Sequence, residues 1–240
     1  MVSTGNAPKA LVLSSGGCDS TVCTGLAVRD FGVENTSTVS MFYGQRHAKE
    51  LDCAKAVALH YGVDHYEIDL AGTHILDAST CALLAGAPNE IEHSTYAEQM
   101  GSDARGMANT YVPFRNGLFL SAVAALAMSI YPQQEVHAYI GVHADEAAGG
   151  AYADCSPEFV DAMAKAISIG TYGLVKLEAP FAHSNKAGVV RAGLELDVPF
   201  RLTWSCYEGG KVQCGTCATC LDRRAAFAAN GVVDPVPYAE

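Results

Sequence analysis

Short apolar runs alternate with stretches of helical spacing along most of the chain. Runs rich in apolar and β-branched residues predict buried strands at 10–13, 36–43, 65–70, 136–142 and 174–178. Apolar positions at helical spacing predict helices between them, at 20–30, from 48 to about 61, at 117–130, at 157–169 and at 185–193. Strands that alternate with helices predict an α/β fold, with a parallel doubly wound, Rossmann-like sheet covered by helices on both faces.

The segment 71–109 breaks this alternation. It is rich in Gly, Ser, Thr, Ala and Asn, and it has only a weak helical pattern at 76–84. A connection of this length usually has a function of its own. We expect it to cover a substrate or to contact another subunit, and a plain surface insertion is the alternative.

The first strand candidate runs into a cluster of small and hydroxyl-bearing residues, Ser14-Ser15-Gly16-Gly17-Cys18-Asp19-Ser20-Thr21. The two glycines permit a tight backbone whose N–H groups stay unpaired at the start of the next helix. Unpaired N–H groups and the helix dipole both favour an anion there, so this stretch is a candidate phosphate-binding loop. It is not the kinase-type loop, because the sequence contains no G-x-x-x-x-G-K-[ST]. An ordinary strand–turn–helix corner is the alternative.

Four of the nine cysteines cluster near the C-terminus with the spacing C-x7-C-x2-C-x2-C: Cys206, Cys214, Cys217 and Cys220. Overlapping C-x2-C turns let backbone N–H groups point at the sulfurs, and four thiolates suit a structural Zn²⁺. An iron–sulfur cluster is the main rival, although the ferredoxin-type run would need a further cysteine and a proline where 221–224 stand. A chance cluster of thiols is the weaker alternative. We therefore predict a zinc-bound C-terminal region of helix and loop, 201–240, packed on a nucleotide-binding domain, 8–200.

Composition narrows the class of protein. Half of the 240 residues are apolar and 17% are charged, which fits a folded chain with a substantial core. The net charge of −11 argues against non-specific binding to nucleic acid. The longest apolar run, 118–130, is too short to span a membrane, and 1–8 lack the pattern of a signal peptide. Clustered cysteines in such a chain indicate metal binding in a reducing compartment, so we expect a cytoplasmic protein.

Several stretches together resemble one family over nearly the whole chain. They are 15–21, 43–47, 112–116, Gly141-Val142, Asp154-Cys155 with Glu158-Phe159, Asn185-Lys186-Ala187 and 203–224. The loop at 15–21 by itself is similar to that of the N-type ATP pyrophosphatases. In this order, with Gly-Gln-Arg-His at 44–47 and the cysteine tail, the stretches resemble the 7-cyano-7-deazaguanine synthase family. One departure is Gly188, where the family has an acidic residue.

This resemblance implies an adenine nucleotide alpha hydrolase-like fold and a ligase of queuosine biosynthesis that forms carbon–nitrogen bonds. Such enzymes activate the carboxylate of 7-carboxy-7-deazaguanine as an acyl-adenylate, form an amide with ammonia, and dehydrate that amide to the nitrile after a second adenylation. The implied cofactors are ATP with Mg²⁺ and a structural Zn²⁺. The implied partners are these small molecules and a second copy in a homodimer, without nucleic acid or membrane.

The resemblance also implies roles for individual residues. Those implied for ATP are Ser14, Ser15, Gly16, Gly17, Cys18, Asp19, Ser20, Thr21 and Val22. Those implied for the deazaguanine are Tyr43, Gln45, Arg46, Arg115, Asn116, Asp145 and Asp154. Implied catalytic roles are Mg²⁺ binding by Asp19, binding of carboxylate or phosphate by Arg46 and Arg115, and contact with pyrophosphate by Lys186.

Each of these roles has a structural alternative. Asp19 could cap the following helix, the arginines could form surface ion pairs, and Lys186 could be solvated. The acid that reads the guanine-like edge is left open among Asp145, Glu146 and Asp154, with Asp154 preferred. His47 and His143 are candidate proton shuttles or structural histidines.

Other functions stay open as well. A related ATP-pyrophosphatase-type amide ligase or tRNA-modifying enzyme shares the loop, and a relative that joins the same carboxylate to another amine or to a protein shares most of the motifs. A zinc-stabilised nucleic-acid-binding module is the non-enzymatic alternative, against which the acidic balance of the chain argues.

Overall fold

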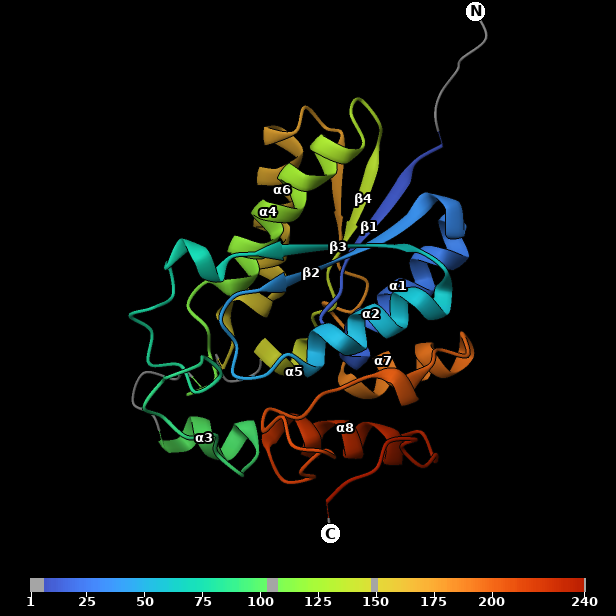
Figure 1. Cartoon of the computed structure of the whole chain (residues 1–240). Helices are drawn as coiled ribbons and strands as arrows, with labels where there is room; N and C mark the ends of the chain where they lie inside the picture. The colour runs from blue at the N-terminus through green and yellow to red at the C-terminus, as the bar shows by residue number, and fades with distance from the viewer. Residues whose placement is uncertain (1–6, 103–107, 148–150, 240) are drawn as a thin grey trace, which may run out of the picture.

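The computed structural model describes residues 7–102, 108–147 and 151–239 (Figure 1). In these ranges the sheet has five strands: β1 (Lys9–Leu13), β2 (Thr36–Phe42), β3 (Asp64–Asp69), β4 (Val136–Tyr139) and β5 (Val175–Glu178). Their order is β3-β2-β1-β4-β5, and each neighbouring pair is parallel. The direction of the order reverses between β1 and β4, and ligands of open parallel sheets bind outside the carboxyl ends of the strands at such a point. The predicted doubly wound α/β fold is confirmed.

Strand β1 is apolar from Ala10 to Leu13 because both of its faces are buried there. Leu11 and Leu13 belong to one hydrophobic cluster, and Ala10 and Val12 belong to a second cluster on the other face. Side chains alternate between the two faces of a strand, so a central parallel strand reads as a continuous apolar run.

Helices cover both faces of the sheet (Figure 1). One face carries α1 (Cys18–Phe31), α2 (Lys49–Tyr61) and α7 (Lys186–Glu195), with α8 (Ala218–Ala229) packed against α7. The other face carries α4 (Arg115–Ile130) and α6 (Pro157–Gly170). Two short helices, α3 (Tyr96–Ser102) and α5 (Ala144–Ala147), lie in the connections. Among the described residues, no helix combines the length and apolar character needed to cross a bilayer.

The start of α6 shows how local sequence sets a helix boundary. The Ser156 side chain accepts a hydrogen bond from the Phe159 N–H, and Pro157 occupies the first helical position. Proline has no N–H to lose there, and a serine cap satisfies one of the free donors of the first turn. The predicted helix start at 157 is confirmed.

The segment 71–109 departs most from the predicted elements. The weak pattern at 76–84 forms turns instead of a helix, and the helix that does form there is α3. Cys81, Ala82, Leu83 and Leu84 are buried in the main core, so this part of the segment is core and not a surface insertion. The apolar residues of this segment therefore pack into the core although they are not spaced at helical intervals.

The C-terminal region is held by a buried ion pair. Arg223 of α8 is fully buried, and its guanidinium donates to both carboxylate oxygens of Asp234, at 2.7 and 2.9 Å. A third donor of the same guanidinium reaches the Thr203 hydroxyl at 2.7 Å. Because two charges are paired out of water, removal of one partner is costly. The predicted boundary between 200 and 201 stays a prediction.

Candidate active site

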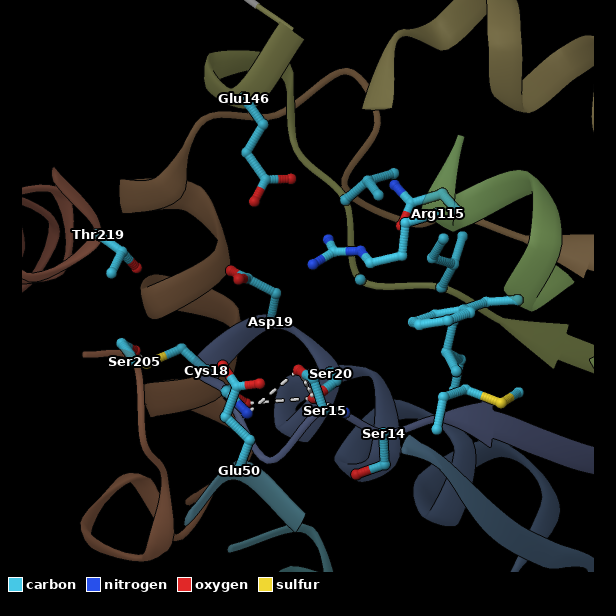
Figure 2. A pocket seen from close by; sticks show the side chains of 18 of the residues that line it. Ser14, Ser15, Cys18, Asp19, Ser20, Glu50, Arg115, Glu146, Ser205 and Thr219 are labelled. Carbon is cyan, nitrogen blue, oxygen red and sulfur yellow. Dashed lines mark hydrogen bonds between the residues drawn. The ribbon is translucent and has the colours of Figure 1, made fainter. Parts of the chain in front are cut away.

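A cavity lies at the carboxyl ends of β1, β2 and β4, where the strand order reverses (Figure 2). It encloses about 990 Å³, part of which is open to solvent. Most of the residues predicted from the sequence line it: Ser14, Ser15, Gly17, Cys18, Asp19, Ser20, Tyr43, Gln45, Arg115, Asn116 and Lys186. The predicted residues that do not line it are Gly16, Thr21, Val22, Arg46, Asp145 and Asp154.

The candidate phosphate loop between β1 and α1 is held by its own hydrogen bonds. The Ser15 N–H donates to the Ser20 hydroxyl at 3.2 Å, and the Gly17 N–H donates to the Ser15 hydroxyl at 3.3 Å. The Thr21 hydroxyl donates to the Gly17 carbonyl at 2.7 Å, so Thr21 fixes the loop from inside the helix. These hydrogen bonds within the loop fix its shape, and fixed geometry of this kind favours anion binding.

Gly16 is the position at which the loop needs glycine. Its φ is +75°, a conformation that side chains disfavour, and a Cβ there would lie 2.7 Å from the Ala54 nitrogen of α2. The Gly16 carbonyl accepts a hydrogen bond from the Trp204 N–H at 2.9 Å. Gly16 therefore joins α1, α2 and the C-terminal region at one point.

Ser14 carries a free hydroxyl at the base of this loop. Its side chain lines the cavity, only 1% of the residue is exposed, and its oxygen has no hydrogen-bond partner within the described ranges. A buried polar atom without a partner is uncommon in native structures. A polar ligand atom in the cavity would satisfy it.

Asp19 and Lys186 form an ion pair across the cavity from two different helices. The Lys186 ammonium donates to both Asp19 carboxylate oxygens, at 2.6 and 2.7 Å. Burial by itself would raise the pKa of Asp19, but Lys186 and His143 lower it overall, so Asp19 is ionised at neutral pH. The pair places one anion and one cation beside the candidate phosphate loop.

Three carboxyl side chains among the described residues line the cavity: Asp19, Glu50 and Glu146. Glu146 points toward Asp19, and Arg115 extends into the space beside them (Figure 2). Asp145 is outside the lining, and its carboxylate accepts from the Lys186 N–H at 2.8 Å at the start of α7. Asp154 is also outside, because its carboxylate accepts from the Asn116 N–H at 2.9 Å and so joins the starts of α4 and α6.

Glu50 was missed by sequence reasoning. It lies in the first turn of α2, and no hydrogen bond of its carboxyl is found within the described part of the chain. One face of α2 carries Glu50, Ala54, Val57 and Tyr61. A carboxyl in this otherwise apolar stripe was therefore the feature of the sequence that could have identified Glu50 as a candidate site residue. Burial raises the pKa of Glu50 to about 7, although Arg115 lowers it in part.

The raised pKa of Glu50 gives a prediction about stability. The pKa is near 4.5 in the unfolded chain, so between pH 4.5 and 7 the native state binds more protons and stability falls as pH rises. We expect Glu50→Gln to lack this loss. The free energy of unfolding of the variant minus that of the wild type should therefore rise by about 3 kcal/mol between pH 4 and pH 8. Urea unfolding across this pH range measures it. Asp52→Asn, an exposed acid on the same helix, is the control, and equal pH slopes for Glu50→Gln and the wild type would contradict the prediction.

The side chains of Gln45 and Arg46 hold the backbone around the cavity. Gln45 accepts from the Tyr43 N–H at 2.9 Å and donates to the Met41 carbonyl at 3.2 Å. The Arg46 guanidinium donates to the carbonyls of Leu84, Ala87 and Asn89. Arg46 therefore fixes the segment that follows Cys81, away from the cavity lining.

The C-terminal region contributes Thr219 and, close to one another in sequence, three further lining side chains that the sequence reasoning did not assign: Trp204, Ser205 and Tyr207. These three flank Cys206, so the segment that carries the cysteine cluster also closes the cavity. The feature of the sequence that could have identified these three residues is an aromatic and hydroxyl-rich run around a candidate metal ligand, Cys206.

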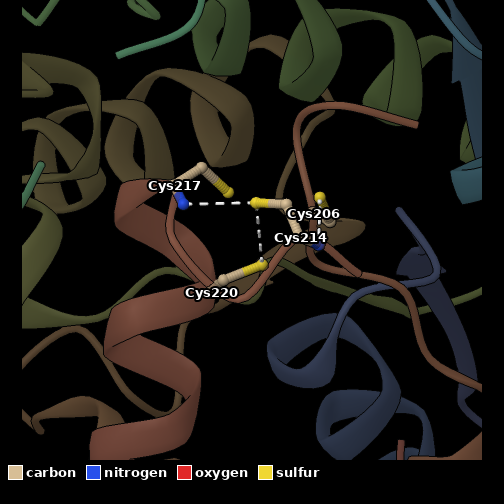
Figure 3. A group of neighbouring side chains, drawn as sticks. All are labelled: Cys206, Cys214, Cys217 and Cys220. Atoms are coloured by element: carbon tan, nitrogen blue, oxygen red, sulfur yellow. Dashed lines mark hydrogen bonds between the residues drawn. The ribbon is translucent and has the colours of Figure 1, made fainter. Parts of the chain in front are cut away.

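The four clustered cysteines are brought together as predicted (Figure 3). The sulfur atoms of Cys206, Cys214, Cys217 and Cys220 all lie within 4.8 Å of one another. Backbone N–H groups donate to them: that of Cys214 to the Cys206 sulfur at 3.3 Å, and that of Cys217 to the Cys214 sulfur at 3.2 Å. Four thiolates at this spacing with N–H donors can hold a metal ion.

These features define the class of protein: a doubly wound α/β chain with a candidate phosphate loop at its topological switch point and a four-cysteine cluster. The family model described as queuosine biosynthesis protein QueC matches residues 9–231, and the chain belongs to this family of enzymes. The resemblance found in the sequence is thereby confirmed.

The chain is also similar to curated proteins with the name 7-cyano-7-deazaguanine synthase. The protein of Caldicellulosiruptor saccharolyticus is 39% identical over 231 residues, which cover 96% of this chain and 95% of that protein. The protein of Archaeoglobus fulgidus is 39% identical over 229 residues, which cover 95% and 89%. Among solved structures, the NMN synthetase of Francisella tularensis is 15% identical with a TM-score of 0.47, over 95% of this chain and 79% of that chain.

Proposed function

We propose that this chain converts 7-carboxy-7-deazaguanine and ammonia to 7-cyano-7-deazaguanine at the expense of ATP, by way of an acyl-adenylate and an amide. The observation that carries the proposal is a cavity in which the loop at 14–20 faces Arg115, Lys186 and the carboxyls of Glu50 and Glu146. Membership of the QueC family and the shared name of its relatives support the choice of substrate.

The chemistry demands stabilisation of negative charge. A carboxylate is a poor electrophile, and adenylation turns one of its oxygens into part of a good leaving group. Pyrophosphate is the group that leaves in this adenylation, and it carries additional charge, which N–H groups at a helix start and nearby cations stabilise. In this chain the first turn of α1, at Cys18, Asp19 and Ser20, would supply the N–H groups, and Lys186 would supply a cation.

Two side chains of opposite charge, Arg115 and Glu50, would position the substrate. The Arg115 guanidinium can take the substrate carboxylate in bidentate fashion. Glu50 replaces Asp154 as the preferred reader of the guanine-like edge, because Asp154 is engaged by Asn116 whereas the Glu50 carboxyl faces the cavity. Two carboxylate oxygens match a pair of N–H donors on such an edge.

The cofactors of the proposal are Zn²⁺ and Mg²⁺ with ATP. Cys206, Cys214, Cys217 and Cys220 fit zinc by donor type and spacing, and a zinc ion there would tie 204–207 to α8. Asp19, ionised and beside the loop, would bind the Mg²⁺ that accompanies the nucleotide. Bound Mg²⁺ supplies additional positive charge at the phosphates.

The remaining parts of the proposal concern partners and location. The net charge of −11 favours small-molecule substrates over nucleic acid. We place the protein in the cytoplasm as a homodimer, and sedimentation of the purified chain tests the dimer. We also keep the division into 8–200 and 201–240 as a proposal, for which limited proteolysis is the test.

AMP release with different substrates tests the proposed function. We expect AMP and nitrile from ATP, Mg²⁺, ammonium and 7-carboxy-7-deazaguanine, and neither product from 7-deazaguanine, which lacks the carboxylate. AMP that appears only when another amine or a protein is supplied in place of ammonium would indicate that the carboxylate is joined to that acceptor. If no nucleotide is consumed by zinc-loaded protein, the proposed function is wrong.

A further inference from the structure

A row of hydroxyl groups reaches the cavity from the segment that interrupts the alternation of strands and helices. The hydroxyl of Tyr96, the first residue of α3, lies 2.7 Å from the Tyr207 hydroxyl. The Tyr207 hydroxyl also lies 3.4 Å from that of Tyr152, which in turn lies 2.5 Å from the Thr110 hydroxyl. We call these four side chains the hydroxyl row. Of the four, Tyr207 lines the cavity, so the other three meet behind it.

The hydroxyl row has one proton more than it has internal contacts. Burial raises the pKa of Tyr96, Tyr152 and Tyr207, so each phenol keeps its proton at neutral pH. Each hydroxyl can donate one hydrogen bond. In the described part of the chain, three contacts join the four hydroxyls, so one proton is left for an acceptor outside the row. When the other members donate toward Tyr207, that proton belongs to Tyr207 and is available to a ligand in the cavity.

The charged neighbours of Tyr207 indicate which acceptor fits. The Arg115 guanidinium, which also lines the cavity, is close enough to the Tyr207 phenol to interact with it electrostatically. Glu146 is a further charged neighbour, but no hydrogen bond joins its carboxyl to Tyr207 within the described ranges. A phenol and a guanidinium are both donors. Side by side in a cavity, they favour an oxygen that carries negative charge.

The proposed function, on which this inference rests, creates such an oxygen in one of its two half-reactions. In the first, ammonia adds to the carbonyl carbon of the acyl-adenylate, a C–N bond forms, and the C=O electron pair moves to the oxygen. The tetrahedral oxyanion then collapses as the C–O bond to AMP breaks and a proton leaves the nitrogen, which gives the amide.

The second half-reaction forms no such oxyanion. The amide oxygen attacks the nucleotide and pyrophosphate leaves. The nitrogen then loses its two protons, and the C–O bond to AMP breaks as the nitrile forms. No nucleophile adds to the carbonyl carbon, so a group that stabilises an oxyanion there contributes to the first half-reaction only.

We propose that the Tyr207 hydroxyl, together with the Arg115 guanidinium, donates to the oxyanion formed when ammonia adds to the acyl-adenylate, and that Tyr96 positions this hydroxyl. Tyr207 is then a catalytic residue, and Tyr96 is a positioning residue that acts through it. The segment 71–109 thereby takes part in the reaction through α3, without a contact of its own to the substrate.

Separate rates for the two half-reactions test the proposal, with the zinc-loaded full chain at saturating ATP and Mg²⁺. One assay starts from 7-carboxy-7-deazaguanine with saturating ammonium and follows the sum of amide and nitrile. The other starts from the amide and follows the nitrile. We expect Tyr207→Phe to lower kcat of the first assay by about 10²-fold or more and to keep kcat of the second within a few-fold of the wild type. Tyr96→Phe should lower the first rate by about fivefold, the effect of one hydrogen bond.

Tyr131→Phe is the matched control. The Tyr131 hydroxyl lies 2.9 Å from that of Ser37 near the start of β2, at the opposite end of the sheet from the cavity. This variant should match the wild type in both assays.

Three results would contradict the proposal. Wild-type rates in Tyr207→Phe, or equal slowing of both half-reactions, would remove Tyr207 from the chemistry, and a wild-type first rate in Tyr96→Phe would remove its positioning role. A wild-type chain that forms nitrile while Tyr207→Phe is unaffected refutes this inference alone. A wild-type chain that forms neither amide nor nitrile refutes the proposed function, and the inference falls with it.

Discussion

Replacement of Asp19 by asparagine is expected to lower ATP turnover by about 10³-fold or more, because an ionised group beside the candidate phosphate loop is lost. Asp19 is anionic in the folded protein since Lys186 and His143 lower its pKa against the effect of burial. The substitution also leaves the Lys186 ammonium without its partner at 2.6 and 2.7 Å. Initial rates of AMP release at saturating ATP measure the effect.

Asp30→Asn is the matched control for this experiment. Asp30 lies near the other end of the same helix, α1, where it is exposed and paired with Arg29. This variant should keep wild-type turnover, and circular dichroism should show that both variants are folded. Turnover in Asp19→Asn within a few-fold of the wild type would remove Asp19 from the proposed mechanism.

Replacement of Cys217 by serine is expected to release the metal from the cysteine cluster and to unfold the C-terminal region. Metal binding at structural zinc sites contributes about 10–16 kcal/mol in small domains, which matches or exceeds the whole stability of a typical protein. Cys217 is fully buried, and its N–H donates to the Cys214 sulfur, so the serine disturbs both the ligand set and the turn. Zinc content by mass spectrometry and the midpoint of thermal unfolding measure the two effects.

Cys53→Ser is the control for the cysteine experiment. Cys53 lies in α2, is only partly buried and belongs to no metal-ligand cluster found among the described residues. We expect it to keep a full complement of zinc and a melting temperature close to that of the wild type. If Cys217→Ser retains zinc and stability, the cluster is not a structural metal site.

The parts of the fold that local sequence determines were predicted well. The apolar run at 10–13 and the glycine-containing loop after it carry their own signals, because a strand buried on both faces and a positive φ at Gly16 each restrict residue type. The cysteine cluster could also be predicted from the sequence, since its four cysteines lie within one short stretch and their sulfur atoms lie close together in the structure. In each of these cases the interacting residues are close in sequence or follow a fixed period.

Features that depend on tertiary contacts could not be predicted in this way. The buried residues 81–84 show no helical or strand period, because they fill space in a core that other elements create. Arg46 looks like an anion ligand in the sequence, but its guanidinium meets the carbonyls of 84, 87 and 89, which only the folded chain brings near. Glu50 and the hydroxyl row likewise need segments that are distant along the chain.

The most direct test of the central claim is isotope transfer from ammonium to the product. With ATP, Mg²⁺, 7-carboxy-7-deazaguanine and ¹⁵N-ammonium, the proposed function predicts a nitrile that carries one ¹⁵N atom, measured by mass spectrometry. It also predicts one AMP for each of the two adenylations, and an amide of the same label in reactions stopped early. AMP formed without any labelled nitrile or amide would contradict the account.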